Sequence, residues 1–142
     1  MKCANKTLSV PTAEKQQMIN VTELLTEAVK ASGVRDGFAG IYSQHTTAAV
    51  FVGEFQDALV DDMLEFLKRV VQDDLAYKHN SPEFSDCQRR NAASHLRGVL
   101  LNHGVLLPIA NGAAVLGQFQ SVVLAELDGP RDRRLHVHIL GQ

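Results

Sequence analysis

The order in which helix-like and strand-like apolar patterns follow one another constrains this chain most. Residues 20–33 and 56–71 each carry apolar side chains at the three- and four-residue spacing of a helix with one buried face. Asn20 and Glu23 have the spacing of a helix-capping pair, and Gly33 is placed to end the first helix. Shorter apolar segments lie before, between and after these helices. This order predicts an α+β fold rather than a doubly wound parallel sheet.

The remaining segments complete the predicted architecture. We expect strands at residues 6–10, 105–109, 118–126 and 134–140, and a third helix from about residue 88 to 102. Residues 38–52 predict two extended segments that meet at a polar corner, or one long bent strand. Asn111-Gly112 is a strong hairpin signal, and Asp128-Gly129-Pro130 predicts a turn. We therefore expect one compact domain spanning 1–142, with a mixed, mostly antiparallel sheet packed against about three helices.

Composition excludes several classes of protein. The 142 residues are 45% hydrophobic and 21% charged, which are ordinary globular values. The formal charge is −2 without a basic block, so no nucleic-acid partner is expected. No apolar run reaches the roughly 18 residues of a membrane span. Cys3 and Cys87 form neither a disulfide framework nor a CxxC metal site, which, with no signal-like segment, favours a cytoplasmic protein with free thiols.

Two of the six histidines lie next to other polar residues in otherwise apolar segments. His95 follows Asn91 by one helical turn, so both side chains lie on one helix face beside the apolar arc. That position fits a hydrogen-bonded histidine at the edge of the core as well as a site. His45, with Thr46 and Thr47, occupies the polar corner between two apolar segments. Such a corner is either a turn or a site for a metal or a phosphate.

The other polar candidates are individually ambiguous. His79 lies in a loop and, by itself, fits an exposed residue. His136 and His138 share one face of the last strand, which fits either a zinc-chelating pair or a solvated sheet face. Gln120 and Glu126 lie on the same face of their predicted strand as apolar residues. This arrangement indicates either a pocket or a half-exposed edge strand. Glu54, just after an apolar segment, has the same ambiguity. No P-loop, dinucleotide-binding glycine motif, HExxH or nucleophile elbow is present.

Several short motifs occur in a characteristic order along the chain. They are His45-Thr46-Thr47-Ala48-Ala49, Glu54, Tyr77-Lys78-His79, Asn91-Ala92-Ala93-Ser94-His95-Leu96, Leu116-Gly117-Gln118-Phe119-Gln120 and Glu126-Leu127-Asp128-Gly129-Pro130-Arg131. In this respect the chain resembles the YjbQ-like family, named for a secondary thiamine-phosphate synthase activity. The resemblance covers nearly everything from residue 37 to the end. It implies an α+β fold that usually assembles as a homotrimer.

The resemblance also implies a site gathered from separate elements. His45, His79 and His95 would bind zinc or a similar divalent ion, leaving one position for water or substrate. Glu54 and Glu126 become candidates for acid–base or supporting roles. The candidates for binding a phosphorylated substrate are Thr46, Thr47, Asn91, Gln120, Arg131 and Arg133, with the arginines acting through charge-assisted hydrogen bonds.

The implied activity joins a pyrimidine pyrophosphate to a thiazole phosphate and releases pyrophosphate. A divalent ion and arginines suit that chemistry because both stabilise the departing charge. The chain departs from the family pattern at Phe119, where tryptophan is usual, and at Gly112-Ala113-Ala114, where a polar or basic residue is usual. Three functions stay open: an enzyme of this transferase type, a non-catalytic trimer that binds a metal or ligand, and a metal-activated hydrolase. Histidines that are merely buried and hydrogen-bonded are the fourth interpretation.

Overall fold

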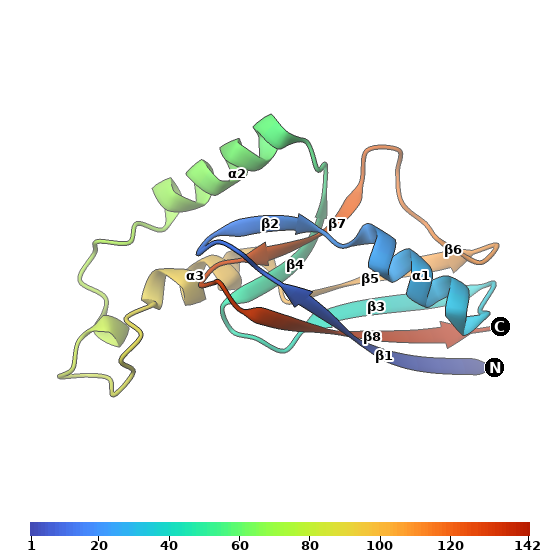
Figure 1. Ribbon diagram of the computed structural model, residues 1–142, viewed down its shortest axis with the longest axis horizontal. Helices are drawn as coiled ribbons and strands as arrows, with labels where there is room; N and C mark the ends of the chain where they lie inside the picture. Colours follow the sequence, from blue (N-terminus) through green and yellow to red (C-terminus); the bar gives the residue numbers. More distant parts are fainter.

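The computed structural model describes all 142 residues and shows how the elements follow one another (Figure 1). The strands are β1 (Lys2–Pro11), β2 (Gln17–Asn20), β3 (Gly37–Ser43), β4 (Ala48–Gly53), β5 (Gly104–Ala110), β6 (Ala113–Ala114), β7 (Ser121–Glu126) and β8 (Asp132–Gly141). The helices are α1 (Thr22–Ser32), α2 (Asp57–Val70), the short 3-10 helix η1 (Lys78–Asn80) and α3 (Ala92–Leu101).

The strands form two sheets, one of five strands in the order β1-β8-β3-β5-β6 and one of three in the order β2-β7-β4. Every strand pair is antiparallel. The predicted α+β class with three helices is confirmed, but the expected mixed sheet is replaced by two antiparallel ones. The chain passes from one sheet to the other between β3 and β4, so the polar corner at residues 44–47 lies at the end of both sheets.

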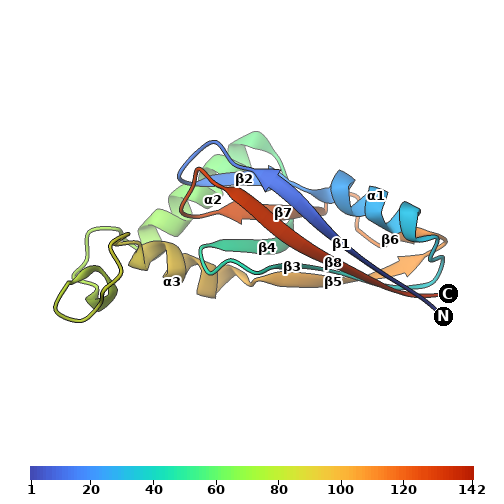
Figure 2. The ribbon, with the colours of Figure 1, turned by 60° about the horizontal axis from the view of Figure 1, so that its bottom comes forward.

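The three-stranded sheet is the central layer of the molecule. On β7, Val122 and Leu124 face the five-stranded sheet, whereas Val123 and Ala125 pack in a second cluster with Leu67 of α2. Because both faces of this sheet are covered, β7 is an almost continuous buried segment and does not alternate between apolar and polar residues. No helix lies over the outer face of the five-stranded sheet (Figure 2).

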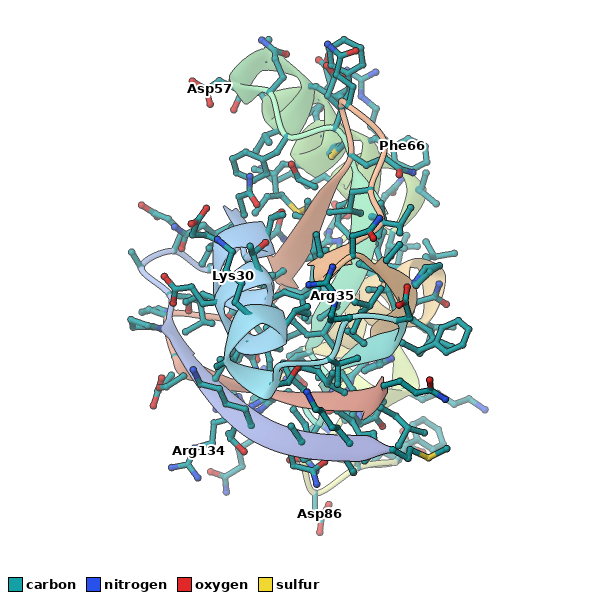
Figure 3. All side chains as sticks on the ribbon, turned by 90° about the vertical axis from the view of Figure 1, so that its right-hand side faces the viewer. Lys30, Arg35, Asp57, Phe66, Asp86 and Arg134 are labelled. Carbon is teal, nitrogen blue, oxygen red and sulfur yellow. The ribbon has the colours of Figure 1, made fainter.

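The first two predicted helices are confirmed, but Val21 rather than Asn20 is the N-cap of α1, and α2 is less buried than its apolar face suggested. Gly33 caps the C-terminus of helix α1 with a φ of 65°, a left-handed conformation that favours a residue without a Cβ. Gln56 caps the N-terminus of helix α2, and its side chain accepts a hydrogen bond from the backbone of Leu59. Only Leu67 of α2 is fully buried, and Phe66 is 60% exposed (Figure 3). The wide apolar face of this helix is therefore only partly covered by the rest of the chain.

Other predicted boundaries move, and two strands are new. Helix α3 begins at Ala92 rather than near residue 88, because Arg90 has a φ of 51° and interrupts the helix there. Strand β7 begins at Ser121 because residues 117–120 form a turn, with the backbone of Gln120 donating to Gly117. Strand β1 begins at Lys2 rather than at residue 6, and strands β2 and β6 were not predicted. No helix is long and apolar enough to cross a membrane.

Candidate functional site

A buried ion pair closes the end of the core between the two sheets. Arg133 of β8 and Glu126 of β7 both have inward strand parity, and both are fully buried. The Arg133 Nε and Nη2 atoms lie 2.7 and 2.5 Å from the two Glu126 carboxylate oxygens. Arg133 Nη2 also donates to the backbone and hydroxyl oxygens of Thr47, at 3.0 and 2.9 Å. Three residues predicted for the site are thus brought together, but they are bonded mainly to one another.

Glu126 stays ionised because its environment is rich in donors. Burial by itself raises the pKa of a carboxyl group, but Arg133, the Asp128 backbone N–H and the Thr12 hydroxyl all donate to it. The net result is that the pKa of Glu126 lies below its ordinary value. Arg133 Nη1, also buried, has no hydrogen-bond partner within the chain. This orphaned N–H therefore points to an acceptor that the chain itself does not supply.

Asp128, two residues beyond Glu126, organises the adjacent polar cluster. Its Oδ2 atom accepts hydrogen bonds from Arg131 Nη2 at 2.9 Å and Asn91 Nδ2 at 2.8 Å, and lies 3.3 Å from Arg89 Nε. Arg131 Nε also donates to the Asp128 backbone oxygen. Asp128 is thereby nearly buried beneath three donors. Arg131 remains 29% exposed, and these two bonds engage only two of the five N–H donors of its guanidinium group.

His79 and His95 form an adjacent pair at the start of α3. Their ring centroids lie 4.9 Å apart with an interplanar angle of 78°. Because Asn91 donates to Asp128 through Nδ2, its Oδ1 faces His79 Nε2, at 3.0 Å. Nε2 must then carry the proton, which leaves the lone pair of a neutral His79 on Nδ1. Burial, and then the neighbouring His79, lower the pKa of His95, so its neutral form is favoured.

His45 lies at the corner between β3 and β4, with its orientation fixed by the backbone. The Arg134 backbone N–H donates to His45 Nε2 at 3.0 Å, so a neutral His45 carries its proton on Nδ1. Burial, followed by the charge of Arg133, lowers the pKa of His45. Arg131 contributes to the lowered pKa of both His45 and His95, so its charge acts on both rings. The surface formed by His45, His79, His95 and Arg131 is called the histidine–arginine surface below.

The predicted three-histidine metal set does not fit this geometry. A metal ligand needs a free lone pair, and that of His45 is already engaged by the Arg134 N–H. No group of three or more His, Cys, Asp or Glu side chains is placed to hold a metal ion. The structure therefore brings His79 and His95 side by side, whereas the Nε2 lone pair of His45 is engaged by the backbone.

Other predicted site residues lie elsewhere. Ala48 pairs with Glu126 and Gly53 with Ser121, so Glu54 and Gln120 stand at the opposite end of the β4–β7 pair. At 3.3 Å per strand residue, Glu54 is about 20 Å from Glu126. Because β4 and β7 run antiparallel, a residue just after β4 lies near the start of β7, whereas Glu126 is at the end of β7. Thr46 is exposed at the corner, where its backbone oxygen would be only 3.1 Å from a Cβ at position 98, a glycine.

Sequence reasoning missed the central role of Asp128, which it assigned to a turn. It also missed Thr12, which donates to Glu126, and Ser94, which donates to the backbone oxygen of Leu127 at 2.6 Å. The available signal was the position of Asp128 and Ser94 inside the ordered motifs of the chain. Thr12 gave none, because its contact with Glu126 spans 114 positions of the sequence.

Comparisons with known proteins agree with this fold. A family model described as UPF0047 protein YjbQ-like matches residues 6–142. A UPF0047 protein of Methanothermobacter thermautotrophicus is 35% identical over 142 residues, covering 100% of this chain and 95% of that protein. The Bacillus subtilis UPF0047 protein YugU is 29% identical over 137 residues, covering 96% and 98% of the two chains.

Solved structures show the same likeness. The crystal structure of a YbjQ-like protein of unknown function from Sulfolobus solfataricus has a TM-score of 0.92 and 31% identity, with 99% of both chains covered. A hypothetical protein from Aeropyrum pernix has a TM-score of 0.89 and 29% identity, covering 98% of this chain and 99% of the other. The chain therefore belongs to the YjbQ-like UPF0047 family.

Proposed function

We propose that this chain is an enzyme acting on phosphorylated small molecules at the histidine–arginine surface, with thiamine-phosphate synthase-like transfer as its reaction. The observation that carries the proposal is the position of Arg131, held on Asp128 with part of its guanidinium group exposed and its charge felt by two histidines. Arginine in this setting is suited to phosphate oxygens because its planar donors bind them in pairs.

The hydrogen-bond donors of the surface suit a pyrophosphate leaving group. The Nδ1–H of neutral His45 and the free N–H groups of Arg131 would both donate to its oxygens. In the transfer, the thiazole nitrogen forms a bond to the methylene carbon of the pyrimidine substrate. The carbon–oxygen bond breaks, and pyrophosphate leaves with that electron pair. The attacking nitrogen already has a lone pair, so this step needs stabilisation of the leaving group rather than a general base.

Hydrolysis is the second candidate, and a separate observation favours it. Asp128 orients Asn91, and Asn91 in turn holds His79 with the lone pair on Nδ1. A base held by a second side chain, itself oriented by a third group, is the usual arrangement for activating a nucleophile. Here the nucleophile would be water attacking a phosphate ester. Hydrolysis requires His79 to accept a proton, whereas transfer does not.

We further propose that the chain assembles as a homotrimer, as the family resemblance implies. Support comes from large apolar side chains that the single chain leaves exposed on its helices. Phe66 and Val70 of α2 are 60% and 52% exposed, and Val99 and Leu100 of α3 are 75% and 55% exposed. Light scattering coupled to size-exclusion chromatography tests the proposal. If the wild type and a Val99→Asp variant both have the mass of a single chain in solution, the proposal is contradicted.

Binding of inorganic pyrophosphate, followed by calorimetry, is the first test of the site. Arg131→Gln removes a charge-assisted donor and should weaken binding at least about tenfold, given about 1.5–3 kcal/mol for such a bond. Arg35→Gln is the matched control. Arg35 is exposed (Figure 3) and precedes the first residue of β3, whereas the polar corner of the site follows the last residue of that strand. Equal weakening in both variants would indicate nonspecific charge attraction and refute the assigned site.

Turnover then separates the candidate reactions. The protein is incubated with the pyrimidine pyrophosphate, with and without the thiazole phosphate, and products are separated by chromatography. Thiamine phosphate formed only with both substrates supports transfer, and a loss of activity in Arg131→Gln links it to the site. Cleavage of the pyrimidine pyrophosphate alone, abolished by His79→Gln, supports hydrolysis instead. Pyrophosphate binding without either product leaves a binding protein and refutes the enzymatic proposal.

A further inference from the structure

A second polar cluster lies on the outer face of the five-stranded sheet, between β1 and β8. Cys3 and Asn5 of β1 point to the same face, because they are two residues apart on a strand. His138 of β8 is directly opposite Asn5 in the register. Cys3 Sγ lies 3.7 Å from His138 Nε2, and His138 Nδ1 is hydrogen-bonded to Asn5 Oδ1. All three side chains are exposed.

The hydrogen bonds assign a role to each member of this cluster. With Asn5 Oδ1 as the acceptor, His138 Nδ1 carries the proton of the neutral ring. The lone pair on Nε2 then faces the Cys3 thiol, within sulfur hydrogen-bond reach. A nucleophile, a base in contact with it and a third group that orients the base form the pattern of an activated cysteine.

An open groove begins at the same histidine. It has a volume of about 520 Å³ and runs over β8, β3 and β5, with His138, Gly40, Tyr42 and Leu106 among its lining residues. Gly40 faces His138 across the strand pair and leaves room there, since an added Cβ would have no neighbour closer than 3.8 Å. Tyr42 and Leu106 are 52% and 68% exposed. These side chains offer an apolar surface across His138 from the thiol, because β8 lies between β1 and the strands β3 and β5.

We infer that Cys3 is a nucleophilic thiol that exchanges with low-molecular-weight disulfides carrying an aromatic or apolar half. His138 Nε2 accepts the thiol proton, and the Cys3 thiolate attacks one sulfur of the disulfide. The disulfide bond breaks as the Cys3–sulfur bond forms, and the released thiolate receives the proton from the imidazolium ring. Cys3 is thereby oxidised to a mixed disulfide and one half of the reagent is reduced to a thiol. The retained aromatic half would extend across His138 toward the groove at Gly40. This site shares no residue with the histidine–arginine surface.

The test measures the rate of reaction of the full chain with 4,4′-dithiodipyridine at neutral pH, followed by the absorbance of the released thiol. A Cys87→Ser background leaves Cys3 as the single thiol. Because His138 is placed to take the thiol proton during the attack, we expect Cys3 to react at least about tenfold faster than N-acetylcysteine. His138→Gln should lower the rate about tenfold, and Asn5→Ala should lower it by a smaller factor. Thr7→Val, on the same face of β1, is the matched control and should change the rate less than about twofold.

Mass spectrometry should locate the adduct at Cys3, and circular dichroism should show that each variant is folded. A Cys3 rate equal to that of N-acetylcysteine, or an unchanged rate in folded His138→Gln, would overturn the inference. The groove is tested by comparing 4,4′-dithiodipyridine with cystamine, which has no aromatic ring. If the ratio of the two rates equals that of N-acetylcysteine, the groove contributes nothing and the assigned substrate class is wrong.

Discussion

Replacing Glu126 by glutamine tests the ion pair that closes the core. Each carboxylate oxygen of Glu126 faces two donors: Oε1 accepts from Arg133 Nη2 and the Asp128 backbone, and Oε2 from Arg133 Nε and the Thr12 hydroxyl. Glutamine has one oxygen and one NH2 group, so either orientation of the amide turns an N–H toward a guanidinium N–H. The substitution therefore breaks the pair while nearly preserving its volume.

The expected loss of stability is large for a change of this size. Removing one partner of a buried ion pair costs about 3–5 kcal/mol, because the other charge remains buried without compensation. The exposed fractions here are 1% for Arg133 and 0% for Glu126, so solvent cannot supply that compensation. With a urea m-value of about 2 kcal/mol/M, the unfolding midpoint should fall by about 2 M.

The assay is urea unfolding at neutral pH, followed by circular dichroism, for Glu126→Gln, Arg133→Met and the double variant. The losses of unfolding free energy in the two single variants should add up to at least about 2 kcal/mol more than the loss in the double variant. The reason is that the second substitution removes a charge that the first has left unpaired. A Glu126→Gln cost below about 1 kcal/mol, or costs that add within about 0.5 kcal/mol, would refute the assignment of a buried, coupled pair.

The same variant should change the response to acid. The pKa of Glu126 is lowered in the folded protein, so its contribution to stability is complete above the ordinary value of about 4.5. That contribution is lost as the pH falls through the lower pKa of the folded state. Unfolding free energies measured across this acid range should fall less steeply for Glu126→Gln than for the wild type. Equal slopes would show that Glu126 is not held ionised by its neighbours.

Four further predictions concern other polar side chains. Arg97→Met should cost about 2–4 kcal/mol in urea unfolding, because this fully buried guanidinium satisfies two carbonyls at the end of α2. Asp73→Asn should cost less than about 1 kcal/mol, since that carboxylate is 62% exposed. Asn91→Ala should release His79 from a single tautomer, seen as changed ring nitrogen shifts in NMR; unchanged shifts would contradict the assigned hydrogen bond. His95 should titrate below 6.5 in NMR, and its contribution to stability, complete above that pH, should diminish as the pH falls; a midpoint above 6.5 would refute this.

The local pattern of residues was sufficient to predict most elements. Helix α1 ends at Gly33 because a residue without a Cβ adopts the left-handed conformation there at little cost. The Asn111-Gly112 turn was predicted because asparagine and glycine both tolerate positive φ, and the two residues have φ values of 54° and 80°. These features depend on backbone conformations within a few residues. The extent to which α2 is buried was not predictable in this way. An apolar helix face shows that the side chains can be buried, but it does not show which part of the protein covers them.

The candidate site was likewise predictable in part from the sequence, and the rest depended on the tertiary structure. The sequence by itself predicted that Asn91 and His95 share one helix face and that His79 lies in a loop, and the family resemblance implied that the two histidines belong to one site. Only the tertiary structure decided that Asp128 links Asn91 to Arg131, and that His45 presents a donor instead of a metal-binding lone pair. The physical reason is that helix caps and turns are set by contacts between neighbours in sequence. Tautomers and ion pairs, in contrast, depend on partners tens of residues away, which only the packing of the two sheets brings into contact.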